Sequence, residues 1–185
     1  MIGIGILNAT QALLVLAPGA GIPAWLNRFK TRLWALIAPV SIALVVASAL
    51  LALHHLRKGD VHLSAGFLVF LAGETLIVSG SAMDVAASAP SFAAGTGLWS
   101  AALALVSAST NIPTLVRVTG SIAAILFAVT AAAIFGGTAL TPLSGPLPFY
   151  AYPFLAVTLL GWAWAHRPSS APAEVGAPAG ARANG

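Results

Sequence analysis

Long apolar stretches alternate with short polar ones along most of this chain. A helix needs about 20 apolar residues to cross the roughly 30 Å hydrocarbon core of a bilayer. Five stretches meet this requirement: 33–53, 61–82, 92–109, 118–136 and 148–165. A sixth, 2–18, is expected to cross as well; if Asn8 and Gln11 keep it at the surface, five spans remain. The sequence therefore predicts an all-α, polytopic transmembrane helical bundle.

Polar or proline-containing segments separate these stretches. The segment HHLRKGD is a tight polar connection, and Pro90 and Pro113 are expected to break the chain before the two helices that follow them. The run 136–153 is rich in proline and aromatic residues, which indicates an interfacial or partly re-entrant turn before the last span. The small, Pro-rich tail 168–185 is expected to be disordered, so residues 1–167 form a single transmembrane domain.

The composition agrees with a lipid environment. Only 6% of the residues are charged and 59% are hydrophobic, whereas about a quarter of a soluble domain is charged. The formal net charge of +4 arises from basic residues that flank apolar stretches, where they meet lipid headgroups. We therefore expect the lipid bilayer as the partner and no nucleic acid. The chain has no cysteine, which excludes disulfides and thiolate metal sites.

The basic residues also predict an orientation. With six spans, one side of the membrane has the larger set, Arg57, Lys58, Arg117, Arg167 and Arg182. The opposite side has Arg28, Lys30 and Arg32. Because cytoplasmic loops are enriched in Lys and Arg, we expect a multi-pass protein of the cell membrane with both termini in the cytoplasm.

Small residues recur at a regular spacing in the stretch 61–82. Gly66, Gly73 and Gly80 are seven residues apart, and each follows another small residue. In lipid, helices associate where small residues let their backbones approach closely, and a spacing of seven suits a left-handed crossing. The three glycines, called the glycine seam below, predict a packing surface for a neighbouring helix.

A single carboxylate, Glu74, lies inside the same apolar stretch. It is next to Gly73, so we expect it to face protein rather than lipid, largely protonated and hydrogen-bonded to Asn8 and Gln11 of the first stretch. Thr75 and Thr130 are further buried polar candidates near its depth. Two interpretations remain open: Glu74 exchanges a proton or cation on a transport path, or it is a structural hydrogen-bonding group.

The four histidines fall on one side of the predicted membrane. His54, His55 and His62 flank one short loop, and His166 ends the last span. Imidazoles near one interface could bind a metal ion or haem iron, but a zinc site usually adds a carboxylate, and only Asp60 is close in sequence. We therefore expect interfacial histidines without a ligand and no bound cofactor, and keep metal or haem binding as the alternative.

No nucleotide-binding loop, dinucleotide fingerprint, metalloprotease motif or serine nucleophile motif is present, so the sequence does not favour an enzyme. The preferred hypothesis is a small transporter or channel-like protein with Glu74 on a proton or solute path, acting as a homo-oligomer or with other membrane subunits. The second is a non-catalytic subunit or scaffold of a larger membrane complex that docks a partner helix on the glycine seam or on the aromatic segment PFYAYPF, 148–154. The third is a metal- or haem-binding membrane protein that uses the histidines.

Overall fold

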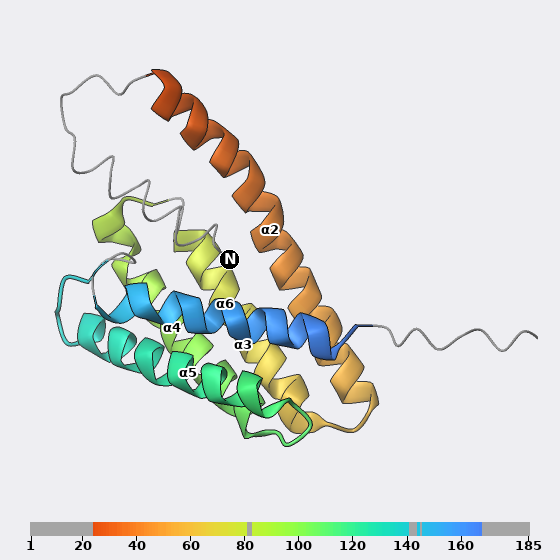
Figure 1. Cartoon of the computed structure of the whole chain (residues 1–185). Helices are drawn as coiled ribbons and strands as arrows, with labels where there is room; N and C mark the ends of the chain where they lie inside the picture. Colours follow the sequence, from red (N-terminus) through yellow and green to blue (C-terminus); the bar gives the residue numbers. More distant parts are fainter. Residues whose placement is uncertain (1–23, 81–82, 141–143, 145, 168–185) are drawn as a thin grey trace, which may run out of the picture.

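The structure, a computed structural model, describes residues 24–80, 83–140, 144 and 146–167, with side chains from residue 41 onward except at residue 85. Within these ranges the chain forms five helices and no strands (Figure 1). The helices are α2 (Ala24–Arg57), α3 (Val61–Gly80), α4 (Val85–Ala108), α5 (Thr114–Phe135) and α6 (Leu147–Ala165). The predicted first span, 2–18, and the predicted disordered tail, 168–185, lie outside the described residues.

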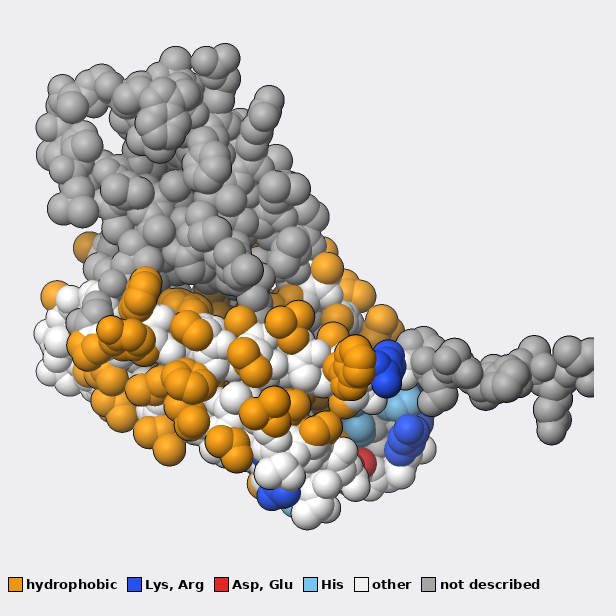
Figure 2. All heavy atoms as spheres, in the orientation of Figure 1, with side chains coloured by type: hydrophobic (Ala, Val, Ile, Leu, Met, Phe, Trp, Pro, Cys, Tyr) orange, Lys and Arg blue, Asp and Glu red, His pale blue; other side chains and the backbone are white. Residues whose placement is uncertain are grey.

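Four of these helices, α3 to α6, are long and apolar enough to cross a membrane. The part of α2 with described side chains is a shorter apolar helix, Ser41–Arg57. Large apolar side chains cover the outer surface: Leu160 is 72% exposed and Leu115 69%, and Figure 2 shows such side chains spread over the visible face. So extensive an apolar surface fits contact with lipid rather than water. The fold is therefore that of a membrane-embedded helical protein, while six spans are not confirmed.

Two helices extend through segments that were predicted as breaks or turns. Pro90 lies inside α4, which begins at residue 85, and Pro153 lies inside α6, which begins at Leu147. The prediction of a break at Pro90, and of a turn through residue 153, is therefore wrong. A proline removes one backbone hydrogen bond, a loss that membrane helices tolerate where neighbouring helices hold them in place. By contrast, Pro113 directly precedes the first residue of α5, as expected of a helix start.

Helices that follow one another in the sequence pack side by side: α2 with α3, α3 with α4, α4 with α5, and α5 with α6. The connections between α2 and α3, α3 and α4, and α4 and α5 are short, whereas the one between α5 and α6 spans residues 136–146. Gly59 has a positive φ of 78° in the turn between α2 and α3, and Gly137 has one of 90° after α5, a conformation that glycine adopts without steric cost. One end of the bundle thus combines the last residues of α2, α4 and α6 with the first residues of α3 and α5. It is called the histidine end below.

The glycine seam packs against α4. A Cβ atom added at Gly66 would lie 2.6 Å from Val106, and one at Gly73 would lie 2.8 Å from Trp99. Gly73 also faces Gly95: a Cβ on either residue would lie 3.0 Å from the backbone oxygen of the other. The two backbones approach so closely because neither residue has a side chain at this point.

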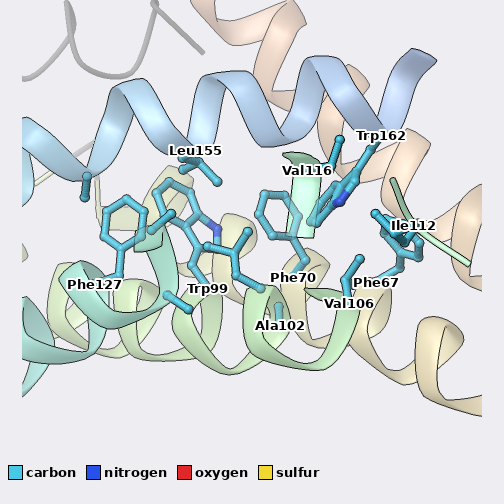
Figure 3. Close-up of a cluster of buried hydrophobic side chains, with 14 of the residues drawn as sticks. Phe67, Phe70, Trp99, Ala102, Val106, Ile112, Val116, Phe127, Leu155 and Trp162 are labelled. Carbon is cyan, nitrogen blue, oxygen red and sulfur yellow. The ribbon is translucent and has the colours of Figure 1, made fainter. Parts of the chain in front are cut away.

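Aromatic side chains fill the interior between α3, α4, α5 and α6 (Figure 3). The Trp99 ring stacks on Phe70 at a centroid distance of 5.8 Å and contacts the edge of Phe127 at 5.4 Å. Trp162, from α6, meets Phe67 at 5.0 Å and Phe70 at 5.5 Å. These contacts connect α6 to α3, although α6 follows α5 in the chain. Between α6 and α3, the core is therefore held together by contacts of large rings, whereas α3 and α4 meet by close backbone approach.

The close approach of α3 and α4 generates a stability prediction. Gly73→Ala should lower the free energy of unfolding by about 1–3 kcal/mol, because the added methyl group overlaps Trp99 and the Gly95 carbonyl. Thermal unfolding in detergent would measure the change. The matched control is Gly97→Ala on α4, where the new Cβ would lie an ordinary 3.6 Å from Ala131 and should leave stability unchanged or slightly raised. Equal effects of the two substitutions would contradict this account of the seam.

Candidate functional site

Glu74 lies on the inner face of α3. The face is formed by residues at helical spacing, and Phe67, Phe70 and Ile77 are its apolar members nearest to Glu74. The Glu74 side chain is 0% exposed, and among the described residues neither of its carboxyl oxygens has a hydrogen-bond partner. A buried polar group without a partner is rare and costly, which singles out Glu74 as a candidate functional residue.

The aromatic side chains of this core contain two further unsatisfied groups. Among the described residues, the indole N–H groups of Trp99 and Trp162 have no hydrogen-bond partner, although both rings are almost fully buried. Trp99 packs against Gly73, the residue before Glu74. The core therefore contains both hydrogen-bond donors and acceptors that the described side chains leave unpaired. Trp162 was predicted from the sequence to mark the membrane interface, but the structure buries it in the core. Trp99 was not singled out, because a tryptophan in an apolar stretch gives no local sign of its neighbours.

Buried hydroxyl groups lie at a depth similar to that of Glu74. Gly73 packs on Gly95, and Gly97 faces Ala131, so Thr96 and Thr130 lie near the level of Glu74. Both threonines are fully buried. However, their hydroxyls donate to carbonyls of their own helices: Thr130 donates to Leu126, and Thr96 donates to carbonyls three and four residues earlier. These hydroxyls are therefore already engaged within their helices.

The other predicted polar candidates are placed differently. Thr75 is exposed and donates a hydrogen bond to the Leu71 carbonyl of its own helix. Its predicted burial is wrong, because one further residue along a helix turns the side chain by about 100°, away from the inner face. Asn8 and Gln11 lie outside the described residues. Asp84, at the opposite end from the histidines, is exposed, as expected of a surface acid.

Most charged side chains of the described chain lie at the histidine end, where Figure 2 shows basic and histidine side chains together. Asp60 directly precedes α3. Its Oδ1 accepts a hydrogen bond from the Leu63 N–H at 3.2 Å, and its Oδ2 accepts one from Asn111 Nδ2 at 3.1 Å. The Leu63 hydrogen bond is the main reason why the pKa of the Asp60 carboxyl is below its ordinary value. Arg117 donates from Nε to the Ser107 carbonyl at 2.9 Å.

Three of the four histidines come together at this end. The Nε2 atoms of His55 and His166 are 2.8 Å apart, although 111 residues separate them in sequence. His54 completes the group, with its ring centroid 5.3 Å from that of His55 and 6.3 Å from that of His166. His62 is exposed and lines a separate cavity next to Val61.

The hydrogen bonds define which ring nitrogens hold protons in the His55–His166 pair. The Nδ1 atom of His166 lies 2.7 Å from the Trp162 carbonyl, which can only accept, so Nδ1 is the protonated nitrogen. In the neutral ring Nε2 then has a free lone pair, to which His55 donates its Nε2–H. His55 lies in the last turn of α2, after the predicted span 33–53, and burial, followed by the proximity of His166, lowers its pKa below the ordinary value. Both effects favour the neutral form of His55.

The fold defines the class: a membrane-embedded helical protein with a buried acid in its core and a histidine cluster at one end. The chain matches no family model, no curated protein and no solved structure. The site itself is therefore the basis for any statement about function.

The position of Asp60 generates a second prediction. Asp60→Ala should cost about 0.5–2 kcal/mol of stability, because it removes the acceptor for the Leu63 N–H at the start of α3. Since the pKa of Asp60 is lowered in the folded protein, its contribution should be complete above the unfolded value of about 3.9 and be lost as the pH falls below it. Thermal unfolding as a function of pH would measure both effects.

Asp84 provides the matched control for this prediction. It occupies the same position before α4, but its side chain makes no capping hydrogen bond. Asp84→Ala should therefore leave the unfolding temperature nearly unchanged. A loss of stability in Asp84→Ala as large as that in Asp60→Ala would show that the hydrogen bond to Leu63 is not the cause.

Proposed function

We propose that this chain is a small membrane transporter or channel-like protein in which Glu74 takes up and releases a proton on a proton or solute path. The observation that supports this proposal best is the position of Glu74 itself. Its carboxyl group is fully buried on the inner face of a helix that can span a membrane. Ionisable groups inside membrane spans usually mark ion or substrate paths.

The competing structural role would require hydrogen bonds from neighbouring helices to the Glu74 carboxyl group. Among the described residues neither oxygen of Glu74 has such a partner, and the predicted partners Asn8 and Gln11 lie outside these residues. An ionised carboxylate in such a place would cost several kcal/mol or more, so a change of protonation state there would strongly affect the packing around it. A proton-linked carrier requires such a link between the protonation state of Glu74 and the packing of the surrounding helices.

The two directions from Glu74 to the ends of α3 are unequal. Gly80 is six residues away, about 9 Å along the helix axis, on the side where Asp84 lies. The first residue of α3 is 13 residues away, about 20 Å, and Phe70 and Phe67 fill the inner face along that route. The route along the inner face toward Gly80 is therefore the shorter of the two, with Ile77 lying on it. Transfer to the histidine end would require movement of the aromatic rings.

A docking subunit is the weaker alternative. One of its two predicted docking surfaces was the glycine seam, but α4 of the same chain already occupies Gly66, Gly73 and Gly80. A partner helix could not approach these glycines without displacing α4. The other surface, the aromatic segment 148–154, has Phe149 and Tyr150 exposed. Association with other copies or other membrane subunits would therefore have to use the lipid-facing surface, and we propose it only in that form.

For the topology, we propose six spans, formed by 2–18, α2 and the four long apolar helices, with both termini in the cytoplasm. Arg57, Lys58, Arg117 and Arg167 all lie at the histidine end of the described bundle. The enrichment of Lys and Arg in cytoplasmic loops supports assigning this end to the cytoplasmic side.

The proposal predicts that Glu74→Gln abolishes proton movement while the fold is kept. Glutamine preserves the size of the side chain but cannot exchange a proton. With the purified chain in liposomes and a pH-sensitive dye inside, Glu74→Gln should reduce proton flux driven by a membrane potential at least tenfold. Asp84→Asn removes an exposed acid at the end of the bundle and should leave the flux unchanged.

Infrared spectroscopy distinguishes a Glu74 that exchanges protons without measurable flux from a Glu74 with a purely structural role. The infrared carbonyl band of the protonated Glu74 carboxyl should disappear in Glu74→Gln and should change with pH between about 5 and 9. Wild-type flux equal to that of empty liposomes, together with a band that does not respond to pH, would overturn the proposal. Unchanged flux in a well-folded Glu74→Gln would overturn it as well.

A further inference from the structure

We propose that His55 and His166 bind a divalent transition-metal ion of the zinc class, which bridges α2 to the end of α6. The two residues come from helices that do not pack extensively on each other in the described part of the chain. Their Nε2 atoms nevertheless lie 2.8 Å apart. The ring centroids are only 5.0 Å apart, so each Nε2 points toward the other rather than toward solvent. This inference does not depend on the role of Glu74.

The surrounding structure fixes the orientation of both rings. His55 is buried and stacks on Phe67 at a centroid distance of 5.5 Å, with 15° between the ring planes. His166 meets the same phenylalanine edge-on at 5.9 Å. The His166 Nδ1–H donates to the Trp162 carbonyl, which is the arrangement that orients metal-binding histidines and leaves Nε2 as the ligand.

The spacing distinguishes a small ion from haem. In a tetrahedral zinc site with Zn–N bonds of about 2.0–2.1 Å, two ligand nitrogens lie about 3.3 Å apart. The observed separation of His55 and His166 is half an ångström or so shorter. Small rotations of the rings would open it, and the proton that His55 holds on Nε2 would move to its Nδ1 so that both Nε2 lone pairs face the ion. Two histidines on opposite faces of a haem would instead be roughly 4 Å apart with the whole macrocycle between them. The pair has no room for such a plane, so the geometry favours an ion.

The surroundings offer further ligands and access. A cavity of about 630 Å³ is lined by His55 and His166 and also by His54, Asp60 and Asn111. No group of three or more possible ligands closes around one point in the described residues. His54 is exposed, however, and could rotate to provide a third nitrogen, with water in the remaining position.

The charges at the cavity are mixed. Lys58 and Arg167 line it and disfavour a cation, whereas the Asp60 carboxylate favours one. The guanidinium of Arg167 lies 3.6 Å from the centroid of the exposed Trp164 ring. This cation–π interaction holds the positive charge of Arg167 over the Trp164 ring. Neutral imidazole is a good ligand for zinc, copper and nickel, which form stronger complexes with nitrogen than magnesium or calcium do. We therefore expect Zn²⁺ binding and no response to Mg²⁺.

The test measures Zn²⁺ binding to the full chain, purified with a histidine-free affinity tag, by competition with a zinc indicator and by thermal unfolding. Wild type should bind one Zn²⁺ per chain, and its unfolding temperature should rise with Zn²⁺ concentration, as expected for a ligand of the folded state. His55→Gln and His166→Gln should each weaken binding at least tenfold and remove the rise. His62→Gln, an exposed histidine at the same end, is the matched control and should behave as wild type.

The variants allow the outcomes to be separated. Glutamine can still donate a hydrogen bond, so His55→Gln should fold; if it does not, His166→Gln at the end of α6 answers the same question. Absence of Zn²⁺ binding to the wild type would overturn the proposal. So would binding that His62→Gln weakens as much as His55→Gln and His166→Gln do, because that would indicate adventitious binding to surface histidines.

Discussion

The structure depends on the close approach of α3 and α4 over glycine. Lipid provides no hydrophobic drive for helices to associate, so backbone contact over small residues has to supply the attraction. Gly73 and Gly95 allow this contact, because neither has a side chain that would separate the helices. The approach positions Trp99 against Gly73, and the Trp99 ring in turn stacks on Phe70 and contacts Phe127. The packing of α3 against α4 therefore sets the positions of several aromatic rings in the core.

The same packing explains why Glu74 is enclosed. Once Gly73 faces α4, the next residue turns about 100° further around the helix and faces the interior next to the aromatic rings. In the described part of the chain the Glu74 carboxyl group has no hydrogen-bond partner, which is the observation behind its proposed proton exchange.

The two ends of the bundle have different chemistry. Asp84 is an isolated exposed acid at one end, whereas the other combines His55, His166, Asp60 and several basic residues. The histidine pair joins the first and last described helices, which otherwise share little contact. Any change at this pair, by a metal ion or otherwise, would act directly on how far α6 can move from α2. From His55, ring contacts run through Phe67 and Trp162 to Phe70, which lies on the same inner face of α3 as Glu74.

The sequence by itself determined the membrane-embedded helical class, the position of most helices and the regular spacing of the glycines. It also indicated that Glu74 lies next to Gly73. These features follow from apolar length and helical periodicity, which are local properties of the chain. Only the tertiary structure decided that α4 covers the glycine seam and that Pro90 lies inside a helix.

The pairing of His55 with His166 likewise came from the tertiary structure alone. The sequence places both residues on one side of the membrane, but contact between them depends on how α6 returns to α2 after three intervening helices. Thr75 gives a second example of what the sequence could not decide. Glu74 is buried and Thr75 is exposed, although they are neighbours in sequence, because the rotation of α3 against its neighbours determines which side chains face the interior. Local periodicity fixes the faces of a helix, whereas its packing partners fix which face is buried.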